Sequence, residues 1–314
     1  MDRATAAAGP ERAEERGGGR RAIAQLALAV VFLSFTPILF RWSELAPSAT
    51  AFYRTFLTIP IFLGWVAVEQ RSGGGSDFDR LVFRRSDFWL LAFGGAMFAS
   101  NISAYGWAVH LTTVANASLL SNLAPMFVAL GNFLLFRERV SRKFIAAMAS
   151  AIIGIAILTG DKLGIDAAQI WGDGLAVFSS AGFAAYLIVL GRLRLRQRSS
   201  VIMAATVVAS SLCLATLALA SGESFLPSTL YGWVDLMALA LISHALGQGL
   251  LTVALVQVGA TFSAMSLLTL PVTAVLYGWL IFAEPLSLNQ AIGAPIVLAS
   301  ILIARLALLP VTRR

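Results

Sequence analysis

Charged residues are scarce in this sequence. Only 12% of its 314 residues are charged and 58% are hydrophobic, whereas soluble domains average about 25% charged and roughly 45–50% apolar residues. A soluble domain with this composition would expose a large apolar surface and aggregate. The composition therefore excludes a soluble globular protein and predicts an integral membrane protein.

Cysteine, histidine and the motifs of common enzymes are also rare or missing. The single cysteine, Cys213, excludes a disulfide framework, and its place in an apolar run indicates a small buried hydrophobe. The sequence has two histidines and no H-E-x-x-H, G-x-S-x-G or phosphate-binding-loop motif, so we expect no enzyme, metal site or other cofactor. It also has no ring of charges or filter-like segment that would indicate an ion channel.

Long apolar runs are what the sequence has in abundance. They are about 18–24 residues long, which lets a helix cross about 30 Å of hydrocarbon. They lack the alternation of barrel strands, so we predict an all-α protein with ten transmembrane helices. The separations at 110–112 and 257–260 are weak, so eight spans with two very long helices is the alternative. The ten ranges are 22–40, 48–68, 88–109, 113–136, 143–160, 171–190, 201–220, 233–256, 261–282 and 288–309.

Lysine and arginine gather on alternate loops. If the N-terminus is cytoplasmic, 19 of the 23 basic residues fall on the cytoplasmic side, as the positive-inside rule requires. Arg41 and Lys162 are the basic residues assigned to outside loops. We therefore predict that both termini are cytoplasmic. The net charge of +7 then reflects topology and attraction to anionic membrane lipids, not nucleic-acid binding.

One pattern occurs twice, as NLAPMFVALGNFLLFRERVS at 122–141 and as LTLPVTAVLYGWLIFAEPLS at 268–287. Aligning the two copies pairs Pro125 with Pro271 and Glu138 with Glu284. Because each half contains an odd number of predicted helices, five, the second half is inverted in the membrane. Inverted repeats of this kind are typical of transporters. The predicted divisions are a disordered cytoplasmic tail (1–21), a first repeat (22–160), an external linker (161–170), a second repeat (171–309) and a cytoplasmic tail (310–314).

The two repeated stretches, the sequence AFYRTFL at 51–57 and the small residues of the fifth and tenth helices carry a family resemblance. The chain resembles the drug/metabolite transporter superfamily, in the ten-helix branch built from two EamA-type repeats, over about residues 22–309. It looks most like the bacterial amino-acid exporters, including those for aromatic amino acids and methyl viologen. The resemblance implies a multi-pass protein of the bacterial inner membrane that exports amino acids and related small metabolites by alternating access. The alternative is broad efflux of hydrophobic cations.

Polar side chains within the predicted spans are the candidates for contacting substrate, because polar groups facing lipid are costly. The triplet His244, Gln248 and Thr252 recurs every four residues, which predicts one face of a helix. Amides and hydroxyls can bind α-amino and α-carboxylate groups, and aromatic rings accept apolar or cationic side chains. Hydrogen bonding between helices is the alternative role for each of them. The predicted substrate-binding residues are His244, Gln248, Thr252, Asn101, Tyr105, Ser121, Asn122, Tyr186, Ser266 and Tyr277.

Arg54 lies inside the second predicted span, where burying a cation costs at least about 2.5–3.5 kcal/mol. Its side chain either snorkels to the outer interface or faces the cavity, where it could close an outer gate. Pro125 and Pro271 each remove a helical hydrogen bond. We therefore assign Arg54, Pro125 and Pro271 to gating or structural roles.

Small residues recur every four positions in the fifth helix, at Ala146, Ser150 and Gly154. Such a ridge allows close helix packing, either between the two halves of the chain or in a dimer. We expect a monomer or a weak dimer.

Acidic residues are missing near the centre of every predicted span. Proton-coupled antiporters usually carry a buried carboxylate that exchanges a proton for substrate. We therefore predict a facilitator without proton coupling. His244 is the reserve candidate for coupling because histidine titrates near neutral pH.

Overall fold

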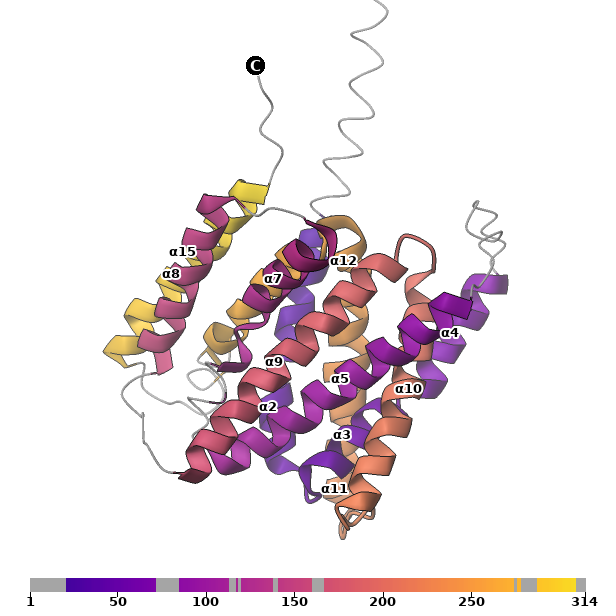
Figure 1. Cartoon of the computed structure of the whole chain (residues 1–314). Helices are drawn as coiled ribbons and strands as arrows, with labels where there is room; N and C mark the ends of the chain where they lie inside the picture. The colour runs from indigo at the N-terminus through magenta and orange to yellow at the C-terminus, as the bar shows by residue number, and fades with distance from the viewer. Residues whose placement is uncertain are drawn as a thin grey trace, which may run out of the picture.

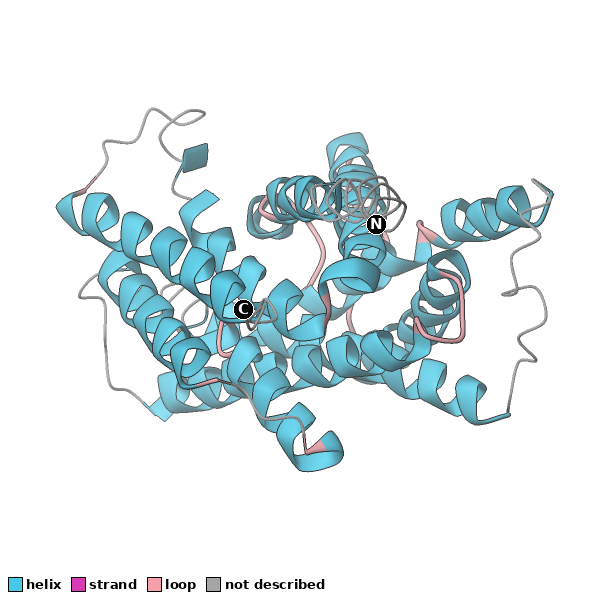
Figure 2. Cartoon of the chain, turned by 90° about the horizontal axis from the view of Figure 1, so that it is seen from above, coloured by secondary structure: helices cyan, strands magenta, loops and turns pink. Residues whose placement is uncertain are grey.

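Every element that the computed structural model describes is a helix, and Figure 2 shows only helices and loops. This confirms an all-α chain for the described residues, which are 21–71, 85–112, 117, 120–137, 141–159, 167–273, 276–277 and 287–308. After a helix over residues 21–33, the elements are α2 (Thr36–Trp42), α3 (Pro47–Phe56), α4 (Ile59–Arg71), α5 (Arg85–Leu111), α7 (Ala124–Phe136), α8 (Arg142–Thr159), α9 (Ala167–Leu193), α10 (Ser199–Ala220), α11 (Leu230–Ala238), η2 (Leu239–Gln248), α12 (Gly249–Val258), α13 (Ala260–Ser266), η3 (Leu267–Thr269) and α15 (Leu288–Leu308).

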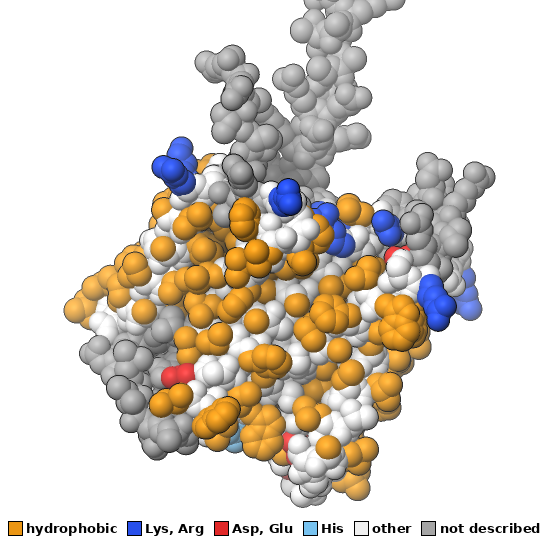
Figure 3. Space-filling view, viewed as in Figure 1, with side chains coloured by type: hydrophobic (Ala, Val, Ile, Leu, Met, Phe, Trp, Pro, Cys, Tyr) orange, Lys and Arg blue, Asp and Glu red, His pale blue; other side chains and the backbone are white. Residues whose placement is uncertain are grey.

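Several of these helices suit a membrane. Apolar side chains cover the middle of the face seen in Figure 3, while its lysine and arginine side chains gather toward the upper end. This is the surface of a multi-pass membrane protein, with apolar groups for lipid and charges at the interface. Five helical stretches are long and apolar enough to cross a membrane: residues 21–40, 47–71, 169–193, 199–220 and 230–258. Shorter apolar helices occupy residues 124–136, 260–273 and 291–304.

Each of the ten predicted ranges contains helix among the described residues. Gly259 adopts φ 82° between α12 and α13, a backbone conformation that glycine reaches without strain, so these two helices are separate. The count of ten membrane crossings and the sidedness of the termini stay predictions. The repeat pair Glu138 and Glu284 lies outside the described residues, as do residues 1–20, 160–166 and 309–314 of the predicted tails and linker.

Several prolines stand where helices start or break, because proline lacks an amide hydrogen and its ring clashes with the preceding turn, although Pro295 lies inside α15. The apolar span over residues 47–71 is divided into α3 and α4 at Leu57 and Thr58, just before Pro60. Pro47 and Pro125 stand in the first turns of α3 and α7, where the missing amide costs no hydrogen bond. The second span is therefore a broken helix, and α3 ends among buried residues.

The helices pack in two groups (Figure 1). α5 lies along α9, and α10 packs against α5, α3 and α4. At the other side α8 pairs with α15, and a Cβ atom on Gly154 would lie 2.9 Å from Ile296 Cγ2 of α15. Ala146, at the other end of the predicted ridge, is exposed. Close packing at Gly154 therefore joins the two halves of the chain.

Candidate functional site

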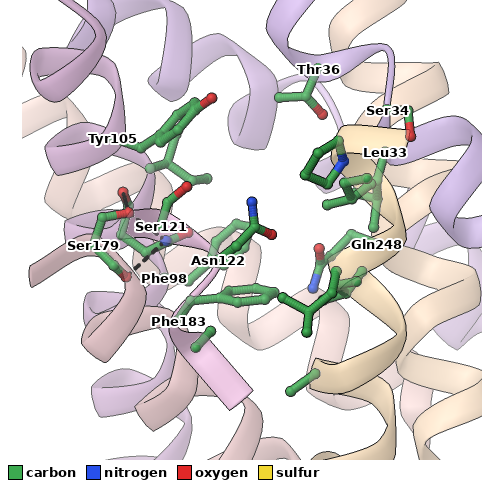
Figure 4. A pocket seen from close by; sticks show the side chains of 18 of the residues that line it. Leu33, Ser34, Thr36, Phe98, Tyr105, Ser121, Asn122, Ser179, Phe183 and Gln248 are labelled. Atoms are coloured by element: carbon green, nitrogen blue, oxygen red, sulfur yellow. Dashed lines mark hydrogen bonds between the residues drawn. The ribbon is translucent and has the colours of Figure 1, made fainter. Parts of the chain in front are cut away.

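A cavity of about 200 Å³ lies in the core, between the helices of both halves of the chain. Its wall is formed by the break between the first helix and α2, by α3, α5 and α9, by the residues that start α7, and by η2, α13 and η3. Figure 4 shows Asn122 and Gln248 on facing walls, with Phe98 and Phe183 below them. The cavity therefore combines amide groups with aromatic surface.

Half of the predicted substrate-binding residues line this cavity, as do all three residues assigned to gating or structural roles. Their contact with substrate stays a prediction. The lining residues are Asn101, Tyr105, Ser121, Asn122 and Gln248, with Arg54, Pro125 and Pro271.

Some of the lining polar groups also tie helices together. The side-chain amide of Asn101 donates to the backbone oxygen and to Oγ of Ser179, each at 2.9 Å, which joins α5 to α9. Thr36 Oγ1 lies 2.5 Å from Ser243 Oγ, and Ser34 is hydrogen-bonded to Thr273. These last two bonds connect the first half of the chain to the second across the cavity wall.

Arg54 occupies the last turn of α3 and lines the cavity with only 6% of its surface exposed. Its Nε atom has no hydrogen-bond partner among the described residues. No aspartate or glutamate is among the described residues that line the cavity. The structure thus places Arg54 in the wall of the cavity and not at the membrane interface.

His244 is fully buried but does not line the cavity. Its ring lies 5.3 Å from the ring of Phe98 and 6.0 Å from that of Phe62, between centroids. Both of its ring nitrogens lack a hydrogen-bond partner among the described residues. His244 therefore packs against two phenylalanine rings, of which that of Phe98 lines the cavity.

Thr252 is also buried away from the cavity, where its hydroxyl donates to the backbone oxygen of Gln248 at 2.9 Å. The predicted common face of His244, Gln248 and Thr252 runs from a π-helix over residues 239–248 into α12. Gln248 alone of the three lines the cavity.

The other predicted residues lie in the helix packing around the cavity. Tyr186 is buried and accepts a hydrogen bond from Gln248 Nε2 at 3.3 Å. Ser266 Oγ donates to the backbone oxygen of Phe262. Tyr277 stacks on Phe35 with centroids 4.6 Å apart and donates to the backbone of Val31.

Several lining residues were not predicted from the sequence, namely Ser34, Thr36, Ser179, Phe98 and Phe183. The stretch Ser-Phe-Thr-Pro at 34–37 carried a usable signal, because two hydroxyls before a proline interrupt an otherwise apolar run. The sequence around Phe98 and Phe183 gave no such signal, since aromatic residues are common in these helices.

A second cavity of about 470 Å³ adjoins the first. Phe40 and Tyr105 line both cavities and so stand between them. His110 and Pro47 line the second cavity, at the end of the bundle where α5 finishes and α3 begins.

A cavity with a few polar side chains in a largely apolar lining, among the apolar helices of a multi-pass membrane protein, is what a membrane transporter requires. The model of the EamA-like transporter family matches this chain twice, over residues 20–160 and 170–306. The chain belongs to this family, within the drug/metabolite transporter superfamily.

Relatives and a solved structure agree with this assignment. The pseudopaline exporter CntI of Pseudomonas aeruginosa is 30% identical over 220 residues, which cover 69% of this chain and 75% of that protein. An uncharacterized transporter of Archaeoglobus fulgidus is 26% identical over 291 residues, covering 88% of this chain and 96% of that one. A crystal structure superimposes with a TM-score of 0.70 at 17% identity, covering 91% of this chain and 97% of that chain, which shows a shared fold.

Proposed function

We propose that this protein exports amino acids and related small metabolites across the bacterial inner membrane by alternating access. In this proposal the chain crosses the membrane ten times as two inverted five-helix repeats, with both termini cytoplasmic, and works as a monomer or weak dimer. The central cavity is the substrate pocket. Two family matches along one chain and an exporter among the relatives support the proposal.

The lining of the cavity is the observation that carries the choice of substrate. Amides from opposite walls, Asn122 and Gln248, can hydrogen-bond the polar end of an amino acid, while Phe98 and Phe183 offer apolar contact to its side chain. A volume of about 200 Å³ is smaller than the roughly 300–1,000 Å³ of pockets for drug-sized ligands. The cavity therefore suits a small metabolite.

Efflux of hydrophobic cations is the competing function, and the aromatic lining favours it. The charge of the lining argues against it. Arg54 is a cation, and no carboxylate joins it among the described lining residues. A second cation in the same cavity would be repelled, because the low dielectric of a buried site strengthens electrostatic interactions.

Facilitated diffusion is the proposed mechanism. No carboxylate that could exchange a proton for substrate lines the described part of the cavity. Asp235 lies within the apolar span 230–258 but does not line the cavity, and neither does His244. A carrier that binds no proton during its cycle gains no free energy from a pH gradient.

Liposomes containing the purified protein test this proposal. We expect radiolabelled leucine and phenylalanine to enter down their own gradients without an imposed proton or sodium gradient, and never to concentrate when such gradients are added. Accumulation of leucine above its outside concentration would contradict the facilitator mechanism. Uptake of quaternary ammonium dyes without uptake of amino acids would favour the competing function.

A further inference from the structure

We propose that Arg54 is the carboxylate-binding residue of the central cavity, so that the transported compounds must carry a free carboxylate. The inference rests on the proposed function in taking this cavity as the substrate pocket. It adds that the pocket requires a carboxylate on the substrate and that Arg54 binds this group.

The chain supplies Arg54 with a place where a buried cation is tolerated. α3 ends two residues beyond Arg54, at the break before Pro60. The C-terminal end of a helix carries a partial negative charge from its unpaired carbonyl groups, and Pro60 has no amide hydrogen to pair with one of them. The last turn of a helix is a favourable position for a cation, and Arg54 lies in it.

Arg54 has no protein counterion in the described part of the chain. None of the described lining residues is acidic, and the Nε donor of Arg54 is buried without a hydrogen-bond partner. Tyr186, whose phenol is also buried, is a neighbour of Arg54. Buried charges in proteins are normally paired, so an anionic group from a ligand completes this site.

A carboxylate is a group that fits a guanidinium well. The planar fork of arginine can donate two parallel hydrogen bonds to the two oxygens of one carboxylate, which a lysine ammonium cannot do. From another wall of the cavity, Gln248 offers an amide oxygen that could accept from an α-amino group. Phe98 and Phe183 would then contact the side chain.

Leucine, leucinamide and isovalerate are the probes that isolate the carboxylate. Leucinamide keeps the amine and side chain of leucine but loses the carboxylate, while isovalerate keeps the carboxylate and loses the amine. With wild-type protein in liposomes, we expect leucine uptake to exceed leucinamide uptake by at least about tenfold, because a site built for a polar group rejects the analogue that lacks it. Equal uptake of the two would overturn the inference whether or not any variant folds.

Substitution then assigns the discrimination to Arg54. In Arg54→Gln, we expect leucine uptake to fall at least about tenfold and the preference over leucinamide to disappear, and in Arg54→Lys we expect partial rescue. The control is Arg71→Gln, on the exposed end of the same span, for which we expect unchanged uptake and unchanged preference. Full discrimination by Arg54→Gln would mean that another residue reads the carboxylate and would overturn the inference.

Binding in detergent separates this inference from the proposed function. We expect isovalerate, but not isovaleramide, to raise the melting temperature of wild-type protein and not that of Arg54→Gln. If no amino acid is transported but this pattern holds, the proposed function fails and the role of Arg54 stands. If leucine is transported and isovalerate and isovaleramide act alike, the role of Arg54 fails and the proposed function stands.

Discussion

At the scale of single residues, some of the buried polar groups line the cavity and others do not. Gln248 and His244 lie in the same π-helix, and each is 1% exposed. Gln248 lines the cavity and donates to Tyr186, whereas His244 lies between two phenylalanine rings with both nitrogens unpartnered among the described residues. The two residues should therefore respond differently to the same substitution.

Leucine at each of these positions tests that difference. Gln248→Leu removes a lining amide and one buried hydrogen bond, so we expect transport to fall about tenfold and stability to fall by about 1 kcal/mol. His244→Leu removes polar atoms that have no partner, so we expect unchanged transport and equal or higher stability. Leucine counterflow in liposomes and melting temperature in detergent measure both effects.

The outcome for His244→Leu also bears on energy coupling. If this variant lost a dependence of transport on pH that the wild type possessed, His244 would be the coupling group and the facilitator mechanism would be wrong. Loss of folded yield in both variants would instead mark the pair as structural.

At the scale of elements, each of two loops supplies a glutamate that caps the helix following the other loop. Both caps lie at the end of the bundle where α3 and α11 begin. Glu223, in the loop before α11, accepts a hydrogen bond from the backbone of Ala49 in the first turn of α3 at 2.7 Å. Glu44, in the loop before α3, accepts from the backbone of Ser228 at 2.7 Å and from the hydroxyl and backbone of Thr229 at the start of α11. Carboxylates at helix N-termini are favourable, so the reciprocal caps hold the two halves of the chain together at this end.

These caps predict a pH-dependent contribution to stability. The hydroxyl of Thr229, with the backbone amides of Ser228 and Thr229, lowers the pKa of Glu44 below its ordinary value of 4.5. Because the folded protein binds the proton more weakly than the unfolded chain, the stabilisation is fully present above about pH 4.5 and is lost as the pH falls through the lowered pKa.

We therefore expect Glu44→Gln to lower the melting temperature at pH 6.5, with a difference from wild type that shrinks as the pH is lowered below about 4.5. Thermal unfolding in detergent at several pH values measures it. A difference that stays constant down to pH 3 would show that Glu44 does not act through its charge. Glu69→Gln, at the opposite end of the span 47–71, is the control for an acidic side chain that accepts a hydrogen bond, from Ser200, away from these caps.

At the scale of the whole molecule, the basic side chains visible on one face gather toward one end, while Arg54 is buried at the cavity. The start of the helix over residues 21–33 and the end of α15 both lie at the upper end of Figure 1, and the visible lysine and arginine side chains of Figure 3 gather there as well. The loop with the carboxylate caps lies at the other end. This distribution supports the proposed orientation, with the basic end cytoplasmic.

Single cysteines in a Cys213→Ala background test that orientation. We expect a membrane-impermeant maleimide to label Gly74→Cys from the cytoplasmic side alone and Ser224→Cys from the outer side alone, in inside-out and right-side-out vesicles. Ser224 is preferable to its neighbour Gly222, whose φ of 67° would be strained by a side chain. The cysteine-free protein is the control, and labelling of both positions from one side would remove the inverted repeat.

The sequence by itself determined the class of protein and the positions of its helices. Long apolar runs, the prolines that start α3 and α7 and the one-sided arginines are local features, and the membrane acts on each of them segment by segment. The repeated stretches around Pro125 and Pro271 were also enough to indicate the transporter family.

The tertiary structure alone decided which polar residues face the cavity. Facing depends on how each helix is rotated against neighbours that are distant in sequence. Gln248 therefore lines the cavity while His244, four residues away, does not. The direction of the Arg54 side chain could not be predicted either, because its sequence position fits both a snorkelling and a cavity-facing side chain. The end of α3 before Pro60 and the packing of α10 against α3 place it at the cavity.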